Sequence, residues 1–178
     1  MPSQRPKLGE ILLSQGAIRL EQLEEALSYQ RGKEERRGRP GWERIGEILL
    51  RLRHVGEETL LAALGAQWGL PQMATLSLKE VDPVLAGKVP IGFAKRYTLL
   101  AMRRENGAVV VAASDPLNLS ALDDLRLALG SPLRVMLAPP KAILSGINQV
   151  YERSTDTAEQ AISDLAAESL DRIAEELS

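Results

Sequence analysis

One stretch of this sequence is written twice, and this duplication limits the possible folds more than any other feature. Residues 7–30 and 44–67 align at a constant offset of 37 residues without a gap. Ten of the 24 aligned positions are identical, including Gly9 with Gly46 and Gln30 with Gln67. A repeat at a fixed period indicates equivalent structural units that bury each other's apolar faces.

Each copy predicts a short helix, a turn and a longer helix. Apolar residues recur at helical spacing on both sides of Gly16, namely Leu8, Ile11, Leu12, Leu20, Leu23 and Leu27. Gly16 readily adopts the left-handed conformation that ends a helix. The second copy has Arg53 there, at a cost on the order of 1 kcal/mol, so we expect a different second turn. His54, the chain's one histidine, is interpreted as an ordinary turn residue rather than a catalytic group.

Residues 31–43, between the two copies, are rich in charge and contain three glycines. Such a run is typical of a solvated loop. The alternative is a basic flap over an anionic ligand, with Trp42 as a stacking residue. Packing of Trp42 against the repeat is the favoured interpretation.

The pattern changes near Leu70, where prolines begin to divide the chain into short elements. Asn106-Gly107 favours a type I′ hairpin turn. We expect helices at 83–88, 91–96, 119–129 and 140–151, strands at 97–103, 108–113 and 133–137, and a separate amphipathic helix at 154–178. Ile162 and Leu165 belong to the apolar stripe of that last helix, which needs a partner in this chain, a second copy or another domain.

The fold class that follows is α+β. A helical-hairpin repeat subdomain (1–70) precedes a small α/β subdomain (71–153) with a three-stranded or larger sheet, and 154–178 forms the amphipathic helix or a linker.

Composition excludes several functions. The 178 residues include no cysteine and carry a formal net charge of −2. The absence of cysteine excludes a disulfide framework and a thiolate metal site, and a single histidine excludes a multi-histidine metal site. The net charge argues against a general nucleic-acid binder. No apolar run approaches the roughly 20 residues that span a bilayer, and the first residues lack a signal-peptide core. We expect a soluble cytoplasmic protein.

Known catalytic motifs are also missing from the sequence. It has no phosphate loop, no Gly-x-Ser-x-Gly and no paired-histidine zinc motif. We therefore predict no catalytic residue and no metal site.

The repeat could bind a ligand as well as build a core. Each copy opens with a cation, an aliphatic residue and a glycine, as in Lys7-Leu8-Gly9, and closes with a glutamine. A cation can meet a phosphate or a guanine edge, and an amide can both donate and accept. From the residues alone both interpretations stay open, and the structural one is favoured.

These spacings resemble the paired 24-residue motif of the MshE N-terminal domain family. Members of that family head the ATPases of type II secretion and type IV pilus systems. The 13 residues between the copies also resemble the family spacing, and Ala-Ser-Asp115-Pro116-Leu-Asn118 is similar to the second part of the same region. The resemblance extends to about residue 153.

The resemblance implies a ligand and a protein partner. Some family members bind cyclic di-GMP through both copies, and type II secretion members dock on the cytoplasmic part of an inner-membrane protein. Carried over by position, the ligand-binding residues are Lys7, Leu8, Gly9, Leu23, Leu27, Gln30, Arg44, Ile45, Gly46, Leu60, Leu64 and Gln67. This chain departs from the pattern at Lys7, which cannot make the bidentate contact of an arginine, and at Ala17, Arg53 and His54.

We therefore predict a docking module of a secretion ATPase that recruits the motor to an inner-membrane platform protein. The alternative is a cyclic di-GMP sensor of a type II secretion or type IV pilus ATPase, and a third interpretation is an adaptor without a motor. The module itself is expected to be no enzyme, with an ATPase core in the parent chain and no cofactor beyond cyclic di-GMP. Nucleic acid and direct membrane insertion are not expected, and the protein would lie at the inner membrane through its partner.

Overall fold

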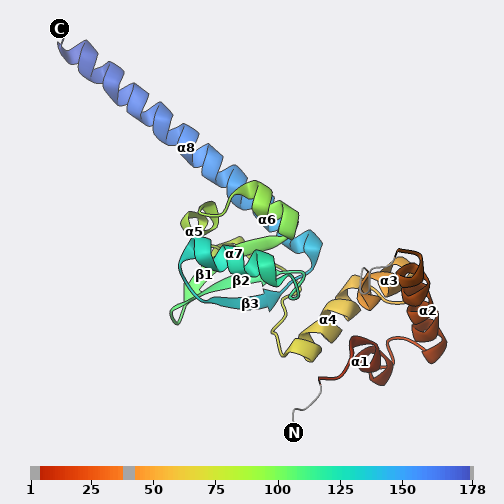
Figure 1. Cartoon of the computed structure of the whole chain (residues 1–178). Coiled ribbons are helices and arrows are strands. Elements are labelled where there is room, and N and C mark those ends of the chain that lie inside the picture. The colour runs from red at the N-terminus through yellow and green to blue at the C-terminus, as the bar shows by residue number, and fades with distance from the viewer. Residues whose placement is uncertain (1–4, 38–42, 177–178) are drawn as a thin grey trace.

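The computed structural model describes residues 5–37 and 43–176, and the molecule has a helical half and a mixed half (Figure 1). The helical half contains α1 (Leu8–Ser14), α2 (Leu20–Arg37), α3 (Ile45–Arg51) and α4 (Glu57–Trp68). The mixed half contains η1 (Leu78–Glu80), α5 (Pro83–Gly87), α6 (Ile91–Tyr97), β1 (Leu99–Glu105), β2 (Ala108–Ala113), α7 (Leu119–Leu129), β3 (Leu133–Leu137) and α8 (Pro140–Glu176). The predicted fold class is confirmed.

The two copies fold as equivalent hairpins that pack crosswise. Helix α1 packs mainly on α4, and α3 packs mainly on α2, so the first helix of each copy covers the second helix of the other. Leu12 and its counterpart Leu49 are both fully buried in the core they share. This exchange joins the copies into one unit with its own hydrophobic core.

The turns inside the two hairpins are also equivalent, which corrects the expectation of a different second turn. Gly16 and Arg53 both have a left-handed φ, of 67° and 58°. The amide of each donates to a leucine carbonyl three residues earlier, over 3.0 Å in both copies. Packing of the repeat therefore outweighs the local cost of placing an arginine there.

This strain gives a first prediction. Arg53→Gly is expected to raise the free energy of unfolding by about 0.5–1 kcal/mol, because glycine removes the left-handed penalty but gains entropy in the unfolded chain. Gly16→Ala is the matched control and should destabilise by about 1 kcal/mol, since an added Cβ meets no atom within 4 Å and only φ is affected. Urea unfolding measures both changes, and a destabilising Arg53→Gly would contradict the argument.

The connection between the copies is more helical than expected. Helix α2 continues to Arg37, so residues 31–37 are helical and not a loop. Arginine, lysine and glutamate are good helix formers, and one glycine does not break the run. Residues 38–42 of the predicted connection, and with them the proposed role of Trp42, lie outside the described residues.

A mixed sheet organises the second half. Strand β2 is central, antiparallel to β1 and parallel to β3. The β1–β2 turn is the predicted one, with positive φ at Asn106 and Gly107. Residues Val109–Ala113 are all buried, which requires cover on both faces of the sheet. Helix α8, with α5 and α6, packs against β1, and α7 lies in front of the sheet in Figure 1.

The last helix corrects a second expectation, because residues 140–176 form one helix and not two. Serine and threonine hydroxyl groups near the expected boundary make their hydrogen bonds within the helix. The hydroxyl groups of Ser154 and Thr157 donate to the carbonyl oxygens of Val150 and Arg153, at 3.0 and 2.7 Å. Helix α8 consequently projects from the body (Figure 1). The domain boundaries at residues 70 and 153 stay a prediction.

The base of α8 is attached to α5. The Tyr151 hydroxyl lies within hydrogen-bond distance of the carbonyl oxygens of Ala86 and Val89. Partial burial raises the pKa of Tyr151 above its usual value, which favours the protonated phenol that donates these bonds.

Candidate functional site

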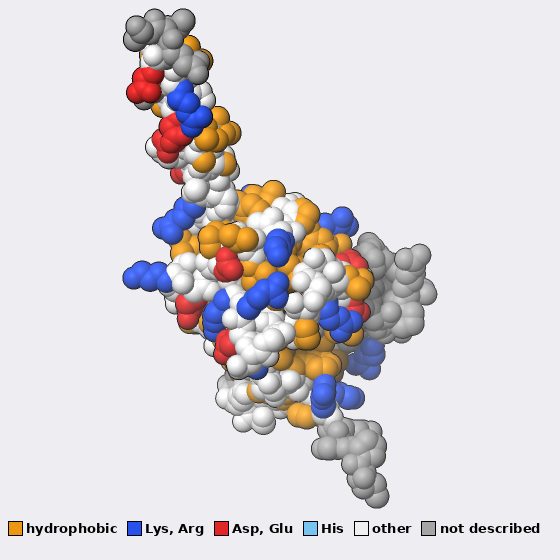
Figure 2. Space-filling view, turned by 90° about the vertical axis from the view of Figure 1, so that its left-hand side faces the viewer, with side chains coloured by type: hydrophobic (Ala, Val, Ile, Leu, Met, Phe, Trp, Pro, Cys, Tyr) orange, Lys and Arg blue, Asp and Glu red, His pale blue; other side chains and the backbone are white. Residues whose placement is uncertain are grey.

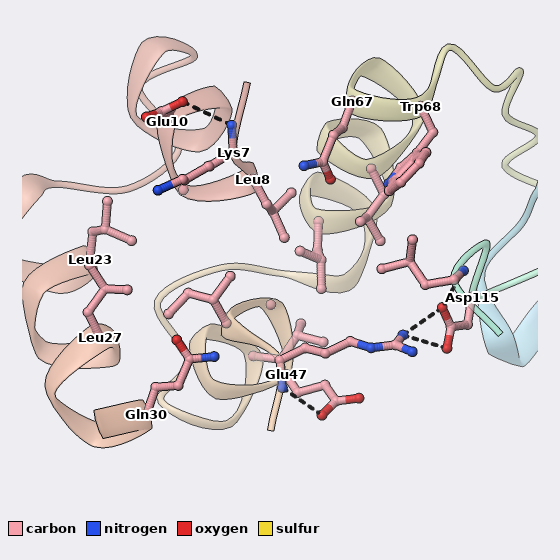
Figure 3. A pocket seen from close by; sticks show the side chains of 18 of the residues that line it. Lys7, Leu8, Glu10, Leu23, Leu27, Gln30, Glu47, Gln67, Trp68 and Asp115 are labelled. Carbon is pink, nitrogen blue, oxygen red and sulfur yellow. Dashed lines mark hydrogen bonds and ion pairs between the residues drawn. The ribbon is translucent and has the colours of Figure 1, made fainter. Parts of the chain in front are cut away.

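The twelve residues predicted from the sequence all line one pocket of about 730 Å³ in the helical half. The pocket opens between the hairpins, and Figure 3 shows α2 and α4 on different sides of it. Seven further residues line it that the sequence did not indicate: Glu10, Glu47, Leu50, Trp68, Ser114, Asp115 and Leu117. Three of these come from the segment after β2, so the second half of the chain forms part of the wall.

The two cations occupy equivalent places. Lys7 and Arg44 are the residues that immediately precede α1 and α3, and both have extended backbone. Their backbone amides donate to the carboxylates of Glu10 and Glu47, at 2.9 and 3.4 Å. Both acidic residues therefore serve the local helix start, while the cationic side chains border the pocket.

The glycines of the motif allow leucines to approach the first helices. A Cβ on Gly9 would lie 2.7 Å from Cδ1 of Leu23, and one on Gly46 would lie 3.0 Å from Cδ1 of Leu60. These distances exclude any larger residue without displacing the leucine. Leucine side chains therefore reach the pocket and give it an apolar floor.

The two glutamines make hydrogen bonds that cross between the copies. Gln30 Nε2 donates to the carbonyl oxygen of Glu43 over 2.8 Å, and Gln67 Nε2 donates to that of Pro6 over 3.1 Å. Pro6 and Glu43 are themselves 37 residues apart. The two bonds are therefore related by the same repeat as the residues that make them.

One ion pair connects the pocket to the second half of the chain. Arg44 Nη1 lies 2.8 and 2.7 Å from the two carboxylate oxygens of Asp115, and both side chains are about 40% exposed. Lys7 has no such ion pair among the residues that the structure describes. Asp115 belongs to a segment that resembles the family. Nothing in the sequence places that segment beside Arg44, and only the packing of the two halves brings them together.

Trp68, the last residue of α4, also lines the pocket. The residue is 37% exposed, and the guanidinium carbon of Arg5 lies 4.7 Å from the ring centroid. The first copy has Arg31 at this position, so the two ends of the pocket are not equivalent. A flat aromatic ring at a pocket edge is suited to contact a planar base.

His54 lies outside the pocket. Its Nε2 is 2.7 Å from a carboxylate oxygen of Glu25, and its Nδ1 is 3.3 Å from Nε2 of Gln22. The side chain thus attaches the second turn to α2, which agrees with a structural role. Among residues 5–37 and 43–176, no group of three acidic, histidine or cysteine side chains could hold a metal ion.

A family model described as the MshEN domain matches residues 68–157, slightly more than half of the chain. The chain belongs to the MshEN domain family. This match covers the end of α4 and the mixed half as far as α8, whereas the sequence resemblance depended mostly on the repeat. The family predicted from the sequence is confirmed.

Curated relatives of this MshEN domain include two pilus proteins. The type IV pilus assembly ATPase PilB of Myxococcus xanthus is 27% identical over 161 residues, which are 89% of this chain and 26% of PilB. PilB of Thermus thermophilus is 34% identical over 200 residues, which are 97% of this chain and 22% of PilB. A bacteriophage adsorption protein B of Escherichia coli K12 is 28% identical over 151 residues, 85% of this chain and 19% of that protein. The chain thus spans about a quarter of the pilus ATPases and about a fifth of the adsorption protein.

Two solved structures share the fold. A structure of MshE with cdg, cyclic di-GMP, has a TM-score of 0.64 and 29% identity, and the match covers 83% of this chain and all of that one. The N-terminal domain of XpsE has a TM-score of 0.57 and 22% identity, with 79% and 91% covered. No described helix of this MshEN domain has the length and apolar character needed to cross a membrane.

Proposed function

We propose that this MshEN domain binds cyclic di-GMP in the repeat pocket and acts as a regulatory module of an ATPase for type II secretion or type IV pilus assembly. The observation that carries the proposal is the convergence of all twelve motif residues on one pocket. Its volume of about 730 Å³ falls within the range of small-molecule sites.

The chemistry of the ligand matches the duplication of the site. Cyclic di-GMP has two phosphates and two guanines related by a two-fold axis, and the pocket has two cations and two leucine floors related by the 37-residue repeat. Lys7 and Arg44 would each face one phosphate. The leucines of α2 and α4 would cover the purine faces. Binding of cyclic di-GMP by the relative MshE supports this assignment.

Calorimetry with cyclic di-GMP tests the proposal. We expect one ligand per pocket with micromolar or tighter affinity, and much weaker binding of the mononucleotide GMP, which can occupy only one half of a two-fold site. Absence of heat at millimolar cyclic di-GMP, with the protein folded by circular dichroism, would exclude the sensor function.

The platform-docking function is a second candidate, favoured by the exposed stripe on α8. Ile162, Leu165, Leu170 and Ile173 are each 53–67% exposed, and the helix lies clear of the body (Figure 2). A groove of about 630 Å³ between α5 and the same helix extends the apolar surface to Ala161.

We propose that the cytoplasmic domain of an inner-membrane platform protein binds this surface of α8, which would keep an ATPase parent at the membrane. Titration of that purified domain should show binding that Leu165→Glu removes, and unchanged binding would exclude α8.

A further inference from the structure

The hydrogen bonds of Gln30 and Gln67 cross from one copy of the repeat to the other. Gln30 belongs to the first copy, but it bonds to the carbonyl of the residue just before Arg44 of the second copy. Gln67 belongs to the second copy and bonds to the residue just before Lys7 of the first. Each glutamine therefore binds the peptide group that immediately precedes the cationic residue of the other copy.

The two glutamines bond to carbonyl oxygens that lie outside the helical hydrogen-bond pattern. The helical hydrogen bonds of α1 and α3 begin at the carbonyl oxygens of Lys7 and Arg44, which accept from Ile11 and Ile48 over 3.1 and 3.2 Å. The preceding peptide, with the carbonyl of Pro6 or Glu43, lies outside that helical ladder. A side-chain amide that donates to this carbonyl orients the peptide and, through it, the backbone of the following cation.

We infer that Gln30 and Gln67 are positioning residues of the nucleotide site: each sets the cation of the opposite copy, so that neither half of the pocket is complete without the other repeat. This inference rests on the proposed function. It differs from direct recognition of a guanine edge by the amide, because a positioning residue acts only through the cation that it sets.

Ligand binding in each half of the pocket should therefore depend on a residue of the other copy. Loss of one glutamine weakens the contact to one phosphate, on the side formed by the opposite copy. A double-mutant cycle separates the two roles, because residues that act through each other are not additive whereas independent contacts are.

The experiment measures cyclic di-GMP affinity, by calorimetry or by NMR titration where binding is weak. Gln30→Met removes the donor and keeps the length of the side chain, and it should lower affinity about three- to tenfold, the usual weight of one hydrogen bond. In the Arg44→Ala background the same change should cost less than about twofold, whereas in the Lys7→Ala background it should keep its full effect. Gln67→Met should show the mirror pattern, silent with Lys7→Ala and fully effective with Arg44→Ala.

A full Gln30→Met effect in the Arg44→Ala background would overturn the inference, since it would show direct contact with the ligand. A ligand-free measurement covers the case in which the wild type does not bind cyclic di-GMP at all. Gln30→Met should then shift the backbone amide and Nε resonances of Arg44 while the backbone amide and Nζ resonances of Lys7 stay in place, and Gln67→Met should do the reverse. Unshifted Arg44 signals would refute the crossed positioning, while an unbound wild type with the expected shifts would refute only the proposed function.

Discussion

Replacing Arg44 with alanine is expected to lower the affinity for cyclic di-GMP by roughly 10- to 100-fold. Arg44 borders the pocket and lies at the start of α3. A charge-assisted hydrogen bond contributes about 1.5–3 kcal/mol, and about 1.4 kcal/mol corresponds to a factor of ten. The fold should persist, because the Arg44 side chain is 45% exposed and its ion pair with Asp115 contributes at most about 1 kcal/mol.

The control for this change is Arg126→Ala. Arg126 lies on α7, its Nη2 pairs with Asp123 at 2.8 Å, and the side chain does not line the pocket. Its removal should leave affinity within about twofold. Lys7→Arg should have the opposite sign to Arg44→Ala and raise affinity, because an arginine can make the bidentate phosphate contact that lysine cannot. Equal affinities for Arg44→Ala and wild type would exclude Arg44 as a ligand contact.

The largest expected loss of stability follows truncation of the repeat core. Leu49→Ala and the equivalent Leu12→Ala each remove a side chain that is fully buried between the crossed hairpins. Such changes cost about 2–5 kcal/mol, from lost burial and from the cavity that remains. The core of the helical half is formed by aliphatic side chains of the two copies themselves, so little other packing is available to compensate.

Chemical unfolding followed by far-UV circular dichroism measures this effect. Leu20→Ala serves as the control, because Leu20 is 57% exposed and its truncation should change stability by less than about 0.5 kcal/mol. The two core variants should lose similar stability, since the positions are related by the repeat. A loss below about 1 kcal/mol in both would mean that the hairpins do not share a core.

Much of this structure could be predicted because its signals are local. The spacing of the leucines determines the two hairpins, and Asn106-Gly107 determines the β1–β2 turn, which has the predicted positive φ values. Gly9 and Gly46 lie at equivalent places because the duplication is written in the sequence. The errors were local as well. Helix α2 continues through the glycine-containing charged segment that we expected to be a loop. Helix α8 continues through the expected boundary, where serine and threonine hydroxyl groups donate to carbonyl oxygens of the same helix.

Packing overrode local preference in one instructive case. Arg53 adopts the left-handed conformation that its sequence disfavours, because the second hairpin follows the geometry of the first. The packing that offsets this local cost involves both hairpins, so the residues of the turn alone do not indicate it.

The sequence by itself determined that two equivalent helical hairpins exist, because the 37-residue period can be read along the chain. The twelve candidate site residues followed from the family resemblance of that repeat. Only the tertiary structure decided how the hairpins cross, so that each glutamine serves the other copy, and that Asp115 meets Arg44 across 71 positions of sequence. Contacts between distant segments depend on how whole helices pack, and a residue pattern confined to one segment does not encode its partner in another.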